Sequence, residues 1–84
     1  MTVYTDIVNN SNGVTRTFES TISDTDLLWH RDQEDRILKV IGNTDWKIQL
    51  DNELPKDIDG VKIEKYAWHR LIKGTGKLVI DIIK

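Results

Sequence analysis

Two histidines, His30 and His69, are the residues of this chain best suited to chemistry, and they are its only histidines. They lie 39 positions apart, so only the folding of two distant segments can bring their imidazoles together. A dense acidic segment follows His30 directly and contains Asp32, Glu34 and Asp35. Imidazole nitrogens and carboxylate oxygens together suit Zn, Fe(II), Mn, Ni or Cu. The sequence therefore contains the donor atoms of a divalent-metal site.

Strand alternation places part of this donor set on one face. Residues 27–31 read as a β-strand, in which successive side chains point to opposite faces. Leu28 and His30 then share a face, and Asp32 joins them if the strand stays extended. We therefore expect His30 and Asp32 to point at one interior spot.

The remaining ligands must come from elsewhere in the chain. A second imidazole from His69 and a carboxylate from Asp35, with Glu34 as a substitute, would complete a set of three or four. Two histidines and one carboxylate also form the facial arrangement of many non-haem iron oxygenases, which leaves positions open for water or substrate. The alternative interpretation is a solvated acidic turn that Arg31 and Arg36 neutralise.

The elements that must position these residues are short strands. Apolar, β-branched runs alternate with turns rich in Asn, Asp and Gly at spacings of roughly ten residues, which is typical of a sandwich or barrel. We expect turns or loops at residues 9–13, 23–26, 42–45, 51–55, 59–60 and 74–76. We expect strands at residues 14–22, 27–31, 36–41, 46–50, 61–64, 67–72 and 78–83. No segment gives a convincing helix, so the sequence predicts an all-β fold.

Size and composition limit the possible classes of protein. The 84 residues predict one domain, residues 1–84, with a small core and no disulfide, because the chain has no Cys. Twelve basic and fourteen acidic residues give a net charge of −2, which argues against a nucleic-acid partner. Neither a signal peptide nor an apolar run of membrane-spanning length is recognisable. We therefore expect a cytoplasmic protein with no membrane partner.

The tryptophans and the amino-terminal segment are the candidate surfaces for binding a small ligand or a second copy of the chain. Trp29, Trp46 and Trp68 could stack on a sugar or an aromatic ligand, but in so small a protein we expect them to fill the core or a dimer interface. In the strand at 46–50, Gln49 faces away from Trp46, so it lines a pocket only if its own face is interior. The β-rich segment 2–22 could pair with the sheet edge of a second copy, and we expect a homodimer.

The two histidine segments resemble the motifs of the cupin superfamily, whose first motif is G-x5-H-x-H-x3–4-E-x6-G and whose second is G-x5-P-x-G-x2-H-x3-N. His30 matches the first histidine, Asp32 takes the place of the second, and Asp35 followed six residues later by Gly42 matches E-x6-G. His69 matches the histidine of the second motif. Residues 29–36 and 69–76 resemble the W-H-R-D-x-E-D-R and H-R-x-I-K-G-x-G runs of small single-domain cupins, and the likeness covers residues 27–83.

The resemblance implies a fold and a site. Cupins are small jelly-roll barrels, so it implies a cupin-like barrel with metal ligands at His30, Asp32, Asp35 and His69. In the second motif Glu64, Tyr66 and Lys73 stand where Pro, Gly and Asn are usual. Fold does not fix function, so three readings stay open: a metal-binding cupin of unassigned activity, a non-enzymatic module for a small ligand such as a sugar, and a metal-free dimeric accessory protein.

Overall fold

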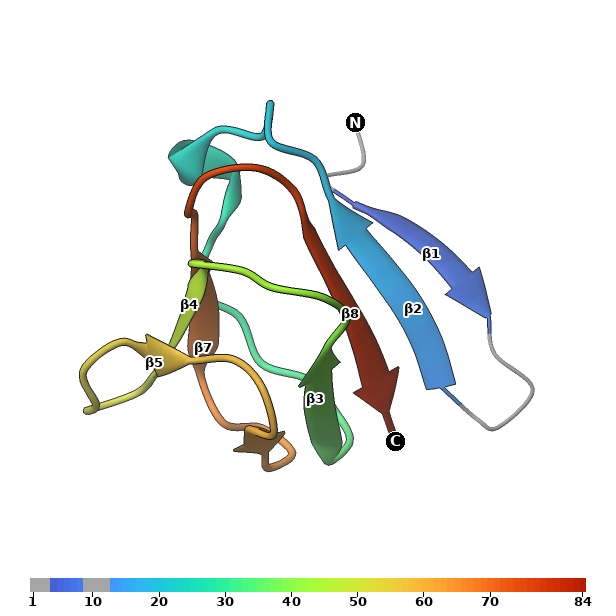
Figure 1. Ribbon diagram of the computed structural model, residues 1–84. Coiled ribbons are helices and arrows are strands. Elements are labelled where there is room, and N and C mark those ends of the chain that lie inside the picture. The colour runs from blue at the N-terminus through green and yellow to red at the C-terminus, as the bar shows by residue number, and fades with distance from the viewer. Residues whose placement is uncertain (1–3, 9–12) are drawn as a thin grey trace.

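Antiparallel strands build the whole framework of the chain. The structure is a computed structural model, and it describes residues 4–8 and 13–84. One sheet has the strand order β1-β2-β8-β3-β6 and a smaller sheet has the order β5-β4-β7 (Figure 1). The strands are β1 (Thr5–Val8), β2 (Gly13–Phe18), β3 (Arg36–Val40), β4 (Lys47–Leu50), β5 (Lys56–Asp57), β6 (Lys62–Ile63), β7 (His69–Ile72) and β8 (Leu78–Ile83).

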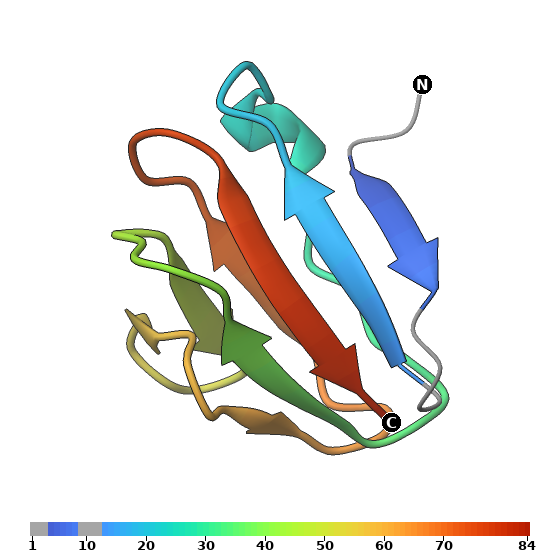
Figure 2. The same cartoon turned by 45° about the vertical axis from the view of Figure 1, so that its right-hand side comes forward.

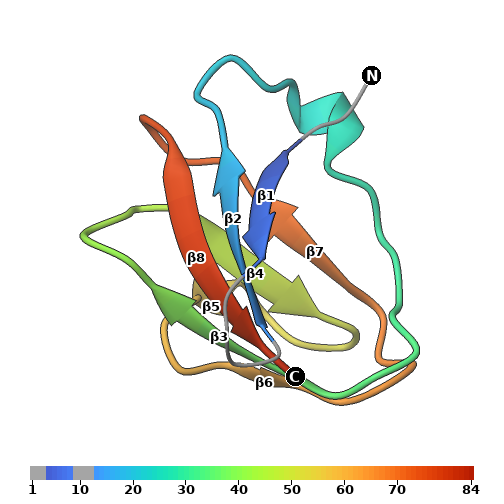
Figure 3. The same cartoon turned by 90° about the vertical axis from the view of Figure 1, so that its right-hand side faces the viewer.

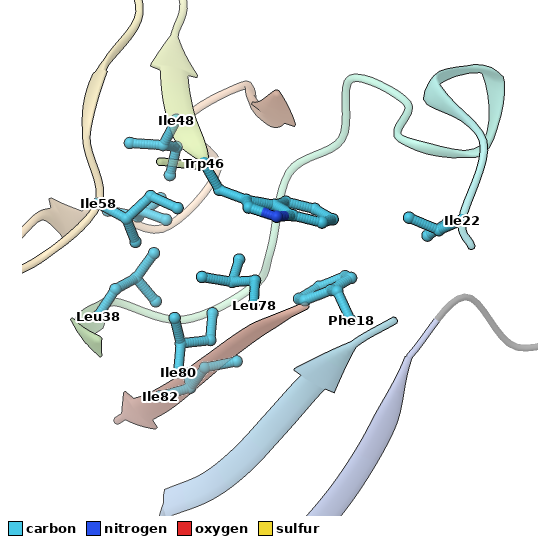
Figure 4. Packing of buried hydrophobic residues seen from close by; sticks show 10 residues of the cluster. Phe18, Ile22, Leu38, Trp46, Ile48, Ile58, Leu78, Ile80 and Ile82 are labelled. Carbon is cyan, nitrogen blue, oxygen red and sulfur yellow. The ribbon is translucent and has the colours of Figure 1, made fainter. Parts of the chain in front are cut away.

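The core lies between the two sheets. Alternation in β8 buries Leu78, Ile80 and Ile82 on the inner face of the larger sheet, which Figure 2 shows from its outer side. Opposite them lies Trp46, which is 1% exposed and donates a hydrogen bond from its indole Nε1 to a backbone carbonyl oxygen at 3.1 Å. Figure 4 shows these side chains pointing toward one another. The complete cluster is Phe18, Ile22, Leu38, Trp46, Ile48, Ile58, Ile63, Leu78, Ile80 and Ile82.

The prediction of an all-β fold is confirmed, and the prediction of a closed barrel is wrong. The ladders of the described residues form two separate sheets. The edge strands β5 and β6, which are neighbours along the chain, have two residues each. A turn separates them, in which the amide of Val61 donates to the carbonyl of Ile58 and Gly60 has a positive φ of 78°. Strands this short end before a ladder can join the two sheets.

Local backbone chemistry also shortens two predicted strands. The strand expected at 14–22 ends at Phe18. The segment expected as a strand at 27–31 is irregular apart from the single bridge residue His30, and a 3-10 turn, η1 (Asp24–Asp26), lies just before it. Ser23 begins η1 because its side chain accepts a hydrogen bond from the amide of Thr25. Polar residues that bond their own backbone favour such a turn over a ladder.

Two sequence expectations reach residues outside the described part. The turn expected at 9–13 is described only at Gly13, which begins β2, and the segment 2–22 is described at residues 4–8 and 13–22. In the described residues, no helix has the length and apolarity needed to cross a bilayer.

Tyr66 has the backbone conformation that favours glycine. Its φ is 65°, in the left-handed region, and it occupies a position where the cupin motif has Gly. Asn52 has a similar φ of 62°, but Asn tolerates this region well. The residue after Tyr66, Ala67, donates its amide to the carbonyl of Glu64 at 3.0 Å, which closes a tight turn just before β7.

We expect Tyr66→Gly to stabilise the protein by about 0.5–1 kcal/mol, because relief of the left-handed strain exceeds the added entropy of the unfolded chain. Thermal or urea unfolding measures the change, which corresponds to an increase of a few degrees in Tm. Asn52→Gly is the matched control and should give no gain. Equal gains from both variants would contradict the account of the turn.

Candidate metal centre

A pair of backbone hydrogen bonds places His30 opposite His69. The amide of each residue donates to the carbonyl of the other, both at 2.9 Å, in an antiparallel bridge. Figure 3 shows the segment after η1 running alongside β7, where this bridge lies. Directly paired residues on antiparallel chains project their side chains to the same face. The two imidazoles therefore meet, with ring centroids 4.2 Å apart and planes at 61°.

Backbone carbonyls hold both rings in one orientation. His30 Nδ1 lies 3.0 Å from the carbonyl oxygen of Leu28, and His69 Nδ1 lies 2.8 Å from that of Ala67. A carbonyl oxygen only accepts, so in a neutral ring Nδ1 carries the proton and Nε2 carries the lone pair. Histidines that bind metals usually donate their other ring N–H to a carbonyl or carboxylate oxygen in this way. The geometry leaves both Nε2 atoms as candidate ligands.

Asp32 supplies the carboxylate, as alternation predicts. Its Oδ2 lies 3.3 Å from His69 Nε2. One ligand atom from each of His30, Asp32 and His69 lies within 4.8 Å of the others, close enough to hold one metal ion. Asp32 Oδ2 is also buried, and it has no hydrogen-bond partner among the described residues. Arg36 Nη1 makes an ion-pair contact with this oxygen at 3.3 Å, without a hydrogen bond. A metal ion would supply the direct partner that the oxygen lacks, so the donor set fits a metal ion.

Burial keeps His69 in the form that binds metals. The side chain is among the buried polar groups of the protein, at 4% exposed. Desolvation lowers the pKa of His69, and the carbonyl of Ala67 and the carboxylate of Asp32 oppose that shift only in part. The ring is therefore neutral at neutral pH, as a metal ligand must be.

Arg36 contacts the same carboxylate oxygen. Its Nη1 lies 3.3 Å from Asp32 Oδ2, and its Nη2 donates to Glu34 Oε1 at 3.1 Å. The hydrogen bond from Arg36 is the main cause that lowers the pKa of Glu34, and Lys84, whose Nζ lies 3.4 Å from Oε1, contributes further. Glu34, the predicted substitute ligand and pocket residue, is thus held by two cations and does not join the group of three.

Asp35 has a different partner from the one predicted. Its Oδ1 accepts a hydrogen bond from the amide of Lys65 at 2.8 Å, and it does not belong to the group that could hold a metal. The next amide, that of Tyr66, donates to the carbonyl of Asp32 at 2.7 Å. Together these bonds attach the turn before β7 to the acidic segment. Asp35 therefore positions the two ligand-bearing segments relative to each other.

Gln49 lies on the outer face of β4, because Ile48, which is 0% exposed, takes the inner face. Its Oε1 accepts a hydrogen bond from Arg70 Nε at 3.0 Å, and its Nε2 donates to the carbonyl of Glu53 at 3.0 Å. The sequence alone did not decide which face of this strand is interior. The structure resolves that choice, and the predicted pocket residue Gln49 does not line the cavity beside the metal ligands.

Two of the three tryptophans stack on arginines next to the histidine pair. Trp29 stacks with Arg70 at 5.0 Å, and Trp68 stacks with Arg31 at 5.1 Å. Each stack joins a neighbour of His30 to a neighbour of His69 across the bridge. Both indoles stay about two-fifths exposed, so the prediction of core packing holds for Trp46 alone. Cation–π contacts of this kind contribute about 0.5–1 kcal/mol each at exposed sites.

A cavity of about 280 Å³ lies beside the three candidate ligands. All three line it, together with Arg36 and with aliphatic side chains from both sheets. Sequence reasoning named Arg36 only as a residue that neutralises the acidic segment. It did not place Arg36 in this cavity, where the guanidinium contacts Asp32.

Comparisons with known proteins return no relative. The chain matches no family model, no curated protein and no solved structure. The resemblance to cupins therefore depends on the motifs alone, and the case for a metal site depends on the geometry above.

The two acidic residues permit an isosteric test of the ligand assignment. We expect Asp32→Asn to weaken metal binding by more than the roughly 10–100-fold typical of changes to residues that contact a ligand but not the metal, because it replaces a carboxylate oxygen with an amide nitrogen and removes the negative charge. Asp35→Asn removes the same charge but retains an acceptor for the Lys65 amide. It should change metal affinity by less than about tenfold.

Calorimetric titration of both proteins with Zn(II) measures the difference. A loss of equal size in the two variants would mean that Asp35 contributes directly to binding, against the contacts seen here.

Proposed function

We propose that this protein binds a divalent first-row transition-metal ion through His30 Nε2, His69 Nε2 and a carboxylate oxygen of Asp32. The observation that carries the proposal is the convergence of these atoms around a buried carboxylate oxygen without a hydrogen-bond partner in the described residues. The set is of the two-histidine, one-carboxylate type, which suits Zn, Fe, Mn, Ni or Cu better than Mg or Ca.

The chemistry of such a centre follows from its open positions. Three protein ligands leave room for water or a small molecule, and a metal held in this way supplies Lewis-acid or redox chemistry. The chain's own contribution is to hold the proton of each neutral imidazole at Nδ1 through the carbonyls of Leu28 and Ala67, which leaves Nε2 as the ligand atom, and to exclude bulk water from His69 by burial.

We also propose a cupin-like jelly-roll architecture. Two residues that align with the cupin motifs, His30 and His69, are directly paired in space, as that resemblance requires. The two facing antiparallel sheets are compatible with a jelly roll that is open at one side. The support for the family thus comes from two distant motifs that meet.

The metal is tested with tag-free protein, because a histidine tag would add ligands. We expect Zn(II), Ni(II), Mn(II), Fe(II) or Cu(II) to raise the melting temperature, with a stabilisation of about 2.7 kcal/mol for a metal present at one hundred times its Kd. A chelator should reverse the shift. His30→Ala and the more conservative His69→Gln should both abolish it.

Asp26→Asn is the matched control, since Asp26 lines the same cavity but lies outside the group of three. Its response to metal should equal that of the unmodified protein. Melting curves indifferent to every metal and to chelator, together with metal-free protein by elemental analysis, would contradict the proposal and favour a metal-free role.

The expected homodimer has a candidate edge in β1. This strand lies at the edge of the larger sheet and is exposed throughout, with Ile7 at 66% and Val8 at 79%. Exposed apolar edge strands favour pairing with another chain. We propose that β1 pairs with a second copy.

Sedimentation velocity at high micromolar concentration tests this pairing. Ile7→Lys should shift the protein to monomer, whereas Ile41→Lys, at another exposed isoleucine away from β1, should not. A monomeric unmodified protein would contradict the dimer without affecting the metal site.

A further inference from the structure

Arg36 has a buried donor that no described residue of the protein satisfies. Two of its guanidinium nitrogens face Asp32 and Glu34. The third, Nε, is buried and has no hydrogen-bond partner in the part of the chain that the structure describes. Such an N–H is costly to leave unmade. Its position therefore points to an acceptor that comes from outside the chain.

The cavity places that donor beside the candidate metal ligands. Arg36, Asp32 and both histidines line it, and so do aliphatic side chains that include Leu27, Leu71 and Ile80. Its volume of about 280 Å³ is well above the roughly 10–15 Å³ that a cavity needs to hold one water molecule. The space accordingly suits a small molecule with one polar end and an apolar body.

The charges identify the polar end as an anion. Among the three candidate metal ligands Asp32 is the one carboxylate, and it already faces the guanidinium of Arg36. Glu34 lies on the far nitrogen of Arg36 and is shared with Lys84. A divalent ion at this site therefore leaves positive charge uncompensated where Arg36 Nε–H is free.

Two other charged residues line the cavity, Arg16 and Asp26. Arg16 is paired with Asp6 at 2.8 Å and stacks on Tyr4 at 3.7 Å, so its charge is already satisfied. Asp26 adds a carboxylate to the lining, but it is exposed and lies outside the metal-binding group, so solvent and salt screen its charge. A carboxylate is the organic anion that matches both a metal ion and the planar guanidinium.

We propose that the cavity binds a small organic carboxylate, whose oxygens face Arg36 and the metal while its apolar body lies between the sheets. This proposal rests on the proposed metal site. It goes further by naming Arg36 as the residue that selects an anionic ligand.

The test uses tag-free protein loaded with Co(II), titrated with isovalerate and, in parallel, with the uncharged isovaleramide. Calorimetry gives the affinity, and the visible spectrum of Co(II) reports changes at the metal. We expect isovalerate to bind at least about tenfold more tightly than the amide, and to alter the Co(II) spectrum.

Arg36→Gln should lose about tenfold or more of the isovalerate affinity. It should also bind Co(II) at least as tightly as the unmodified protein, because a cation next to Asp32 is removed. A purely structural role of Arg36 would not produce this pair of effects. Arg16→Gln, which changes an arginine of the same cavity, should leave the preference for isovalerate intact.

If Arg36→Gln does not fold, Arg36→Lys replaces it in the test, because lysine keeps the positive charge and removes the Nε donor. The Arg36→Lys variant should also lose isovalerate affinity. Equal binding of isovalerate and the amide to Co(II)-loaded protein, or full affinity in both Arg36 variants, would overturn this inference and leave the metal site standing. Failure to bind Co(II) at all would instead overturn the proposed function, and the inference with it.

Discussion

The candidate site depends on one backbone interaction, the two reciprocal hydrogen bonds between His30 and His69. These bonds fix the register of the segment after η1 against β7, and a slip of one residue would turn His30 to the outer face. The surroundings reinforce the register from both sides. Arginine–tryptophan stacks brace the outer face, and the bond from the Tyr66 amide to the Asp32 carbonyl fixes the next step of the acidic segment.

The electrostatics of the site follow from this register. Because His30 and His69 are paired, Asp32 projects its carboxylate toward His69 and into reach of Arg36. The carboxylate oxygen lies near an imidazole nitrogen and a guanidinium at 3.3 Å each, without a hydrogen bond from the described residues. A metal ion would satisfy that oxygen and both imidazoles at once, and the guanidinium would then retain charge for a second anion.

Sequence reasoning predicted what depends on local periodicity. Alternation correctly placed His30 and Asp32 together, and turn residues marked most strand ends. The contact between His30 and His69 was predicted from the motif resemblance. The two residues are 39 positions apart, and their pairing is fixed by backbone hydrogen bonds that no local sequence pattern encodes. The predictions of Asp35 as a metal ligand and of a closed barrel failed for the same reason, since both depend on contacts between distant segments. The carboxylate of Asp35 accepts a hydrogen bond from the amide of Lys65, 30 residues away. The edge strands β5 and β6 are too short to join the two sheets.

The most direct test of the account is to observe the imidazole nitrogens themselves. Long-range proton–nitrogen correlation spectra of ¹⁵N-labelled, metal-free protein should show both rings protonated at Nδ1 and bare at Nε2, as the carbonyls of Leu28 and Ala67 require. Stoichiometric Zn(II) should then shift both Nε2 resonances together. Rings protonated at Nε2, or a shift confined to one histidine, would contradict the claim that this backbone pair builds a metal centre.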